Sequence, residues 1–111
     1  LFIYREVKML KPLTQLADDH TAVLADMFKL LGDPSRLKIV IALLDGPLSV
    51  GSIAERLSLS PSLVSHHLRL LRAARIASHE RRGRQMLYSV HDHHIRCVIE
   101  DMVEHVTEGA D

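Results

Sequence analysis

Two helix starts and one helix stop constrain the fold of this chain more than any other feature. Asp33-Pro34 and Ser60-Pro61 each place a capping side chain before a proline, and Asp45-Gly46-Pro47 stands between them. Proline at the first helical position loses no needed N–H, and Asp or Ser can cap the helix. The breaks therefore predict short helices over residues 34–44 and 61–74.

The predicted helix over 61–74 has two distinct faces. Val64, Leu68 and Leu71 recur at i, i+4 and i+7 and form a stripe suited to a core. The second face is small and polar, and consists of Ser62, Ser65, His66 and Arg69. A shorter helix predicted near 52–57 precedes it across a tight turn, which is the helix-turn-helix pattern. Its second helix enters the DNA major groove, where serine and histidine can bond bases and arginine can bond a phosphate.

A basic hairpin is predicted directly after this helix. Residues 76–81 and 84–90 have strand character and are joined at Arg82-Gly83. Its tip carries three arginines, Arg81, Arg82 and Arg84. Taken alone, these residues also fit an ordinary solvated hairpin. After a helix-turn-helix they form a wing whose arginines reach phosphates or the minor groove. The predicted fold is mainly α with a small β-hairpin: a winged helix-turn-helix that binds double-stranded DNA.

The total charge of zero hides a strong asymmetry. Residues 60–90 contain six arginines and one glutamate, a net charge of +5, whereas residues 91–111 contain one arginine and six carboxylates, a net charge of −5. This division suggests a basic part facing a polyanion and an acidic part facing a cation. With 111 residues and 47% hydrophobic residues, the chain is predicted to form one globular domain over 1–111.

Cellular location is predicted from what the sequence lacks. The aliphatic run 39–44 is too short to span a membrane, and residues 1–10 do not resemble a secretory signal. The lone Cys97 cannot form an intrachain disulfide, which fits a reducing compartment. We expect a cytoplasmic protein with no membrane partner.

Two further helices are predicted to form a homodimer. A domain of this size reads few base pairs, and such domains normally act as dimers on paired half-sites. Apolar residues at helical spacing predict one helix from about Thr14 to Leu31 and another over about 93–107. The second helix carries an apolar seam for a partner helix, formed by Ile95, Val98, Ile99, Met102, Val103 and Val106.

Metal-ligating side chains lie beside this seam in two pairs. Asp92 and His94 stand at the start of the helix, and His105 and Glu108 are i, i+3 neighbours near its end. The two histidines are roughly 16 Å apart along the axis, at about 1.5 Å per residue. Zinc ligands lie about 2 Å from the metal, so one helix cannot bring both pairs to one ion. An antiparallel helix pair can, which predicts two equivalent intersubunit sites per dimer.

Two other interpretations remain open from the residues alone. The acidic residues can be a solvated face of a dimer helix, with Cys97 or another ligand controlling a regulator that senses no metal. A small zinc hydrolase is the second alternative. Four protein ligands leave no open position for an activated water, and no nucleophile–base pair stands out. We therefore predict no enzyme activity and no small organic substrate.

The sequence resembles the ArsR/SmtB family of bacterial metal-sensing repressors, specifically its zinc sensors with the metal site on the last helix. The resemblance rests on "DPSRL", "SLVSHHLRLL", "GRQMLYS" and the tail "DHHIRCVIEDMVEHVTE". It implies a winged-helix homodimer, zinc or cobalt ligands Asp92, His94, His105 and Glu108, and DNA-reading Ser62, Ser65 and His66. It also implies that His105 bonds the backbone carbonyl near Arg75, so that metal binding releases palindromic operator DNA.

The chain departs from family members that bind metals through thiolates. Those members carry a cysteine motif where this sequence reads "LSVGSIAERL", residues 48–57, which contains no cysteine. Soft ions prefer sulfur ligands, so sensing of arsenite, cadmium or lead through thiolates is not expected. Cys97 matches no family ligand, and we interpret it as a packing residue.

Overall fold

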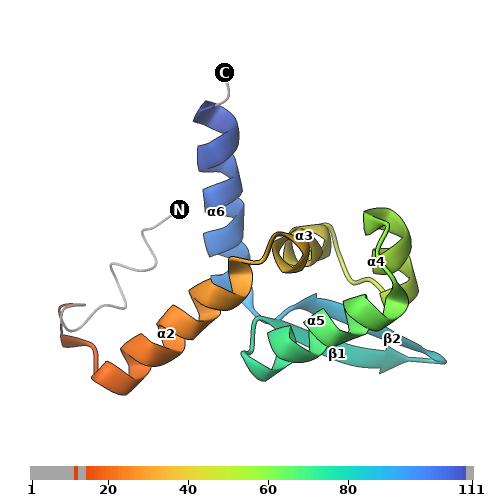
Figure 1. Cartoon of the computed structure of the whole chain (residues 1–111), viewed down its shortest axis with the longest axis horizontal. Coiled ribbons are helices and arrows are strands. Elements are labelled where there is room, and N and C mark those ends of the chain that lie inside the picture. The colour runs from red at the N-terminus through yellow and green to blue at the C-terminus, as the bar shows by residue number, and fades with distance from the viewer. Residues whose placement is uncertain (1–11, 13–14, 110–111) are drawn as a thin grey trace.

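A computed structural model describes Pro12 and residues 15–109 of the chain. The described elements follow one another as α2 (Asp18–Leu31), α3 (Pro34–Leu43), α4 (Val50–Leu57), α5 (Pro61–Ala73), β1 (Ala77–Arg82), β2 (Gln85–Val90) and α6 (His93–Gly109). The predicted fold class is therefore confirmed: helices dominate, and β1 and β2 form a two-stranded antiparallel sheet. In Figure 1, α5 lies beside the hairpin, and α6 stands away from both.

The predicted caps set the starts of α3 and α5. The Asp33 carboxylate accepts from the Arg36 N–H at 3.0 Å, and the Ser60 hydroxyl accepts from the Leu63 N–H at 3.1 Å. α4 starts earlier than predicted, at Val50, because Ser49 caps it through the Ser52 N–H. Each cap satisfies a backbone donor that the helix itself leaves unpaired.

Several predicted bounds are corrected by the structure. α2 begins at Asp18 rather than near residue 14, which lies outside the described residues, as does the segment 1–10. α5 ends at Ala73 with Ala74 as its C-cap, and α3 ends at Leu43. The hairpin turn lies at Gly83-Arg84, one residue later than predicted, because Arg82 pairs with Gln85 in the ladder. α6 extends to Gly109.

One core holds these elements together. It includes the predicted α5 stripe, all of which is buried, and residues of α3, α4, the hairpin and α6: Ile39, Val40, Leu43, Ile53, Ala54, Val64, Leu68, Leu71, Ile76, Ala77, Val90 and Ile99. Leu48 adds a short bridge to β2, with hydrogen bonds of 2.8 and 3.0 Å to Tyr88. The bridge fixes the hairpin against the helical part.

α2 and one side of α6 lie at the edge of this core, with Met27, Leu30 and Leu31 of α2 packed half-buried against it. None of the residues of α2 is buried, and Phe28 is 57% exposed. Met102 and Val106 of α6 are 57% and 68% exposed. Among the described residues no helix is both long and apolar enough to cross a membrane.

Candidate DNA and metal sites

The candidate reading face is the exposed polar side of α5, and another side of this helix packs in the core. Val64, Leu68 and Leu71 fix one side of the helix in the core. The predicted polar residues point away from it: Ser62, His66 and Arg69 are exposed, and Ser65 is half-buried. The cap at Ser60 and the proline at the first helical position define the end of α5 that would meet base edges.

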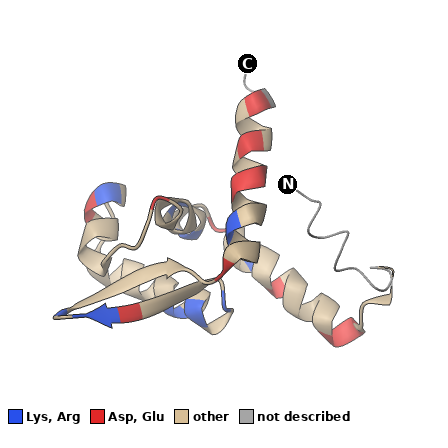
Figure 2. Cartoon of the chain, turned by 180° about the vertical axis from the view of Figure 1, so that it is seen from behind, with Lys and Arg blue, Asp and Glu red and all other residues tan. Residues whose placement is uncertain are grey.

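The candidate wing projects beyond the helical part of the molecule. Arg81, Arg82 and Arg84 are all exposed at or beside the turn, and Figure 2 shows the hairpin tip basic. Arg82 lies 3.5 Å from Glu80 in an exposed ion pair. Gly83 adopts a φ of 61°, a left-handed conformation that favours glycine, and this permits the tight turn. The structure thus holds the three arginines on a twisted two-stranded arm.

The two candidate ligand pairs lie at opposite ends of α6, as predicted. All four side chains are exposed. Within the part of one chain that the structure describes, no three His, Cys, Asp or Glu side chains come together in a way that could hold a metal. The donors are imidazole nitrogens and carboxylate oxygens, which suit a tetrahedral zinc ion, but each pair supplies only two of four ligands. Neither pair alone completes a tetrahedral site.

Asp92 has a local role that its sequence position did not reveal. Its Oδ1 accepts from the Ile95 N–H at 3.0 Å, so Asp92 is the capping residue of α6. A carboxylate at this point also interacts favourably with the positive end of the helix dipole. The cap orients the candidate ligand, and it leaves the second carboxylate oxygen for another partner.

The predicted apolar seam of α6 divides into two rows. Ile99 is buried, and Ile95 and Val103 pack half-buried on the core. Val98, Met102 and Val106 are exposed and follow each other along the helix as far as the turn that carries His105 and Glu108. The prediction that the whole seam faces a partner helix is therefore wrong for Ile95, Ile99 and Val103. These residues pack against the core of their own protomer.

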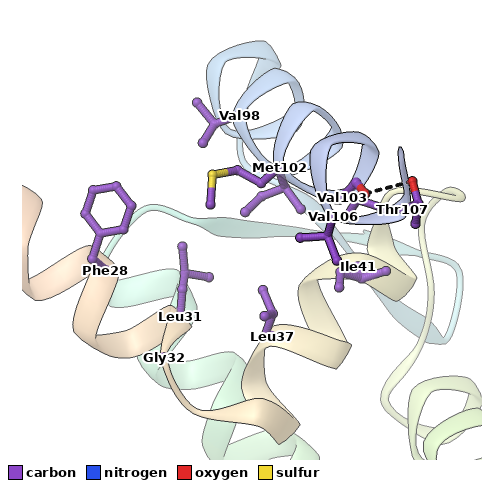
Figure 3. A pocket seen from close by; sticks show the side chains of 11 residues that line it. Phe28, Leu31, Gly32, Leu37, Ile41, Val98, Met102, Val103, Val106 and Thr107 are labelled. Carbon is purple, nitrogen blue, oxygen red and sulfur yellow. Dashed lines mark hydrogen bonds between the residues drawn. The ribbon is translucent and has the colours of Figure 1, made fainter. Parts of the chain in front are cut away.

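The exposed row borders a cavity of about 530 Å³ between α6 and the α2–α3 corner. Figure 3 shows Met102 and Val106 from α6 facing Phe28, Leu31 and Ile41 across it. The sequence pattern predicts α2 as a dimerisation helix, but it does not reveal Phe28 or this cavity. The i, i+4, i+8 spacing of Val98, Met102 and Val106 places these three residues on one side of α6, and this spacing could have indicated a separate apolar face.

Two other side chains of the acidic tail are structural. Arg96 donates to the Leu44 carbonyl at 2.8 Å and so ties α6 to the end of α3. Cys97 is buried, as a packing residue should be, with its sulfur 3.3 Å from Nε2 of His93. The predicted bond from His105 to the Arg75 carbonyl is not among the hydrogen bonds of the described residues. Arg75 itself adopts a left-handed φ of 60° just after α5.

Comparison with known proteins adds independent information. Residues 33–79 match the family described as "Bacterial regulatory protein, arsR family". The chain is 36% identical over 91 residues to a transcriptional repressor SmtB homolog of Synechocystis sp., covering 82% of this chain and 69% of the relative. A cadmium resistance transcriptional regulatory protein CadC homolog of Staphylococcus aureus is 35% identical over 106 residues, 95% of this chain and 88% of the relative. The solution structure of apo-NmtR matches with a TM-score of 0.72 and 33% identity, over 91% of this chain and 85% of that one.

Proposed function

The chain belongs to the arsR family of bacterial regulatory proteins, and we propose that it is a homodimeric repressor released from DNA by Zn(II). The dimer binds palindromic operator DNA in the cytoplasm. The effector, Zn(II) or Co(II), binds at two equivalent sites between the α6 helices of the protomers. No enzyme activity is part of this proposal, in keeping with relatives that are transcriptional regulators.

One observation carries the metal part of the proposal. The exposed row Val98, Met102 and Val106 runs along a helix that carries an incomplete ligand pair at each end. Covering this row with the antiparallel α6 of a second protomer would remove apolar surface from water. The same pairing brings Asp92 and His94 of one chain beside the second pair of the other. Burial and ligand geometry thus both support the same dimer.

DNA binding is supported by the arrangement of α5 and the hairpin. Ser62, Ser65, His66 and Arg69 form an outward face on the recognition helix. Arg81, Arg82 and Arg84 extend the basic surface onto the wing. We assign the α5 residues to the major groove and the wing arginines to phosphates or the minor groove.

The choice of metal follows from the donor atoms. Imidazole and carboxylate suit zinc and cobalt, whereas soft ions prefer thiolate. One relative is named for cadmium resistance. Residues 48–57, on and just before α4, contain no cysteine, so a thiolate site at that place is not available to this chain. The relative named for cadmium resistance also favours a metal effector over a regulator that senses no metal.

Release of DNA would follow from coupling between the α6 pair and the reading head, which consists of α5 and the hairpin. A bound Zn(II) supplies coordination bonds between the two protomers. We propose that His105 then donates its second ring N–H to the Arg75 carbonyl at the end of α5, as bound histidines commonly do with a backbone acceptor. That bond would favour a dimer whose recognition helices fit the operator less well. By linkage, DNA weakens zinc binding by the same factor.

Fluorescence anisotropy on DNA from directly upstream of the gene tests this proposal. Metal-free protein should bind tightly, and zinc should weaken binding by about 5- to 150-fold, the usual range of such couplings. His105→Ala and Glu108→Gln should bind DNA normally but resist release. Glu104→Gln is the matched control, since this exposed α6 carboxylate is no proposed ligand. Normal release of His105→Ala by zinc would refute the site assignment.

A further inference from the structure

A second histidine of the recognition helix lies on the opposite side from the reading face. His66 is exposed, but His67 is only 6% exposed and is the one buried polar residue in the described part of the chain. Its Nδ1 accepts a hydrogen bond from Nε of Arg36 at 3.2 Å. A side chain of α3 therefore holds α5 directly behind the reading face.

Arg36 joins three elements at one corner. Its Nη1 donates to the Leu30 carbonyl, in the last turn of α2, at 3.1 Å. Its own N–H donates to the Asp33 carboxylate that caps α3. Leu31 and Gly32 at the end of α2 and Leu37 next to Arg36 line the cavity against α6 (Figure 3). The guanidinium thus connects the corner next to the proposed dimer face with the back of the recognition helix.

We propose that Arg36 and His67 are a positioning pair that holds α5 in the orientation required by operator DNA, and that the pair works only while His67 is neutral. This inference rests on the proposed operator binding, and it identifies the His67 imidazole as a group whose protonation weakens that binding. An imidazole that accepts at Nδ1 carries its proton on Nε2. Protonation of Nδ1 removes the acceptor and sets a second positive charge against Arg36.

The surroundings of His67 favour its neutral form. Burial is the main cause that lowers the pKa of His67, and the positive charge of Arg36 lowers it further. Asp33 opposes this by raising the pKa, and His66 on the same helix lowers it slightly more. The contact from α2 to this pair is the Leu30 carbonyl, which accepts a hydrogen bond from Arg36. At neutral pH the pair is therefore intact.

Loss of the pair should weaken DNA binding without removing any DNA contact. When α5 samples several orientations in the free protein, the apparent Kd rises in inverse proportion to the fraction that is correctly oriented. The partly buried guanidinium of Arg36 would also lose an acceptor, which disfavours the native arrangement. Neither effect changes the residues that face the groove.

Operator anisotropy with metal-free protein at about pH 7.5 and about pH 5.5 tests the pair. His67→Asn keeps an acceptor near the Nδ1 position but cannot be protonated. His67→Leu removes the acceptor, and Arg36→Met removes the donor. At the higher pH we expect His67→Asn to bind like wild type and the other two to bind about three- to tenfold more weakly. At the lower pH, wild type should lose affinity relative to His67→Asn.

Two results would overturn the pair: equal binding by His67→Leu and His67→Asn at about pH 7.5, or a ratio of wild-type to His67→Asn affinity that does not change with pH. The second comparison holds even if His67→Leu fails to fold, because it uses only the two proteins that keep an acceptor. Failure of wild type to bind the DNA at either pH would instead refute the proposed function, and the inference with it.

Discussion

Single side chains at the helix N-termini fix where α3, α4, α5 and α6 begin. Asp33, Ser49, Ser60 and Asp92 each accept a hydrogen bond from the backbone three residues later. Each bond pairs an N–H that the first turn leaves without a helical partner. The cap at Ser60 has functional weight, because it precedes the proposed DNA-reading residues.

The two serines at the start of α5 provide a matched comparison. Ser60→Ala removes the cap and should lower the free energy of unfolding by about 1 kcal/mol. Ser62→Ala, two residues later on the exposed face, should leave that free energy almost unchanged but weaken operator binding. Urea unfolding followed by circular dichroism measures the first effect, and anisotropy the second. Equal stability losses in both variants would contradict the assigned roles.

The buried His67 also predicts how stability depends on pH. Because its folded pKa lies below the ordinary value of 6.5, the unfolded chain binds more protons between those two values. The stabilisation is therefore complete above about pH 6.5 and is lost as the pH falls toward the folded pKa. Urea unfolding of metal-free protein should show wild type losing stability relative to His67→Asn over this window. A difference that is constant with pH would contradict this expectation.

At the scale of elements, the base of the hairpin is held both by a contact from outside and by contacts between its own strands. Tyr88 pairs with Leu48, and its ring lies 5.4 Å from that of His79 across the strands. These contacts and the buried Ala77 and Val90 fix the base of the hairpin, while its tip remains exposed. A firm base and an exposed basic tip are what a wing requires.

The wing predicts a salt effect for Arg81. Arg81→Ala should weaken operator binding and reduce the slope of log K against log salt by about 1, as expected for one lost phosphate contact. Gln85→Ala, at an exposed uncharged position of the same hairpin, should leave the slope unchanged. Anisotropy over a series of salt concentrations measures both. An unchanged slope in Arg81→Ala would remove this arginine from the DNA contacts.

At the scale of the whole molecule, the charges are sorted by position. Figure 2 shows acidic bands along α6 and basic residues on the hairpin and α5. The net charge of zero is therefore the sum of a basic reading head and an acidic outer helix. This separation keeps the carboxylates of α6 away from the surface proposed to meet phosphates.

Dimerisation and zinc binding should fail together. Met102→Glu places a charge in the exposed apolar row, and an unpaired charge buried there should raise the dimer Kd about 100-fold or more. The same variant should lose tight zinc binding, because each protomer supplies only two ligands. Sedimentation equilibrium and zinc titration measure the two effects, with Glu104→Gln as the control. Tight zinc binding by a monomeric Met102→Glu protein would refute the intersubunit site.

Local sequence signals determined the winged-helix fold and the position of both candidate sites. Capping residues before Pro34 and Pro61 act over a single turn, and the stripe Val64, Leu68 and Leu71 follows from the helical period. The proposed ligands on α6 likewise follow from spacing. Such signals depend on residues that are close together in the sequence, so they can be recognised without a tertiary structure.

Only the tertiary structure decided which of two similar residues is covered. His66 and His67 are adjacent, yet one is exposed and the other accepts from Arg36. Ile99 and Met102 belong to one apolar seam, yet only Ile99 is buried by its own protomer. The helical period defines faces, but the choice among faces depends on packing between residues distant in the sequence. For that reason the positioning pair and the exposed α6 row emerged only from the packed molecule.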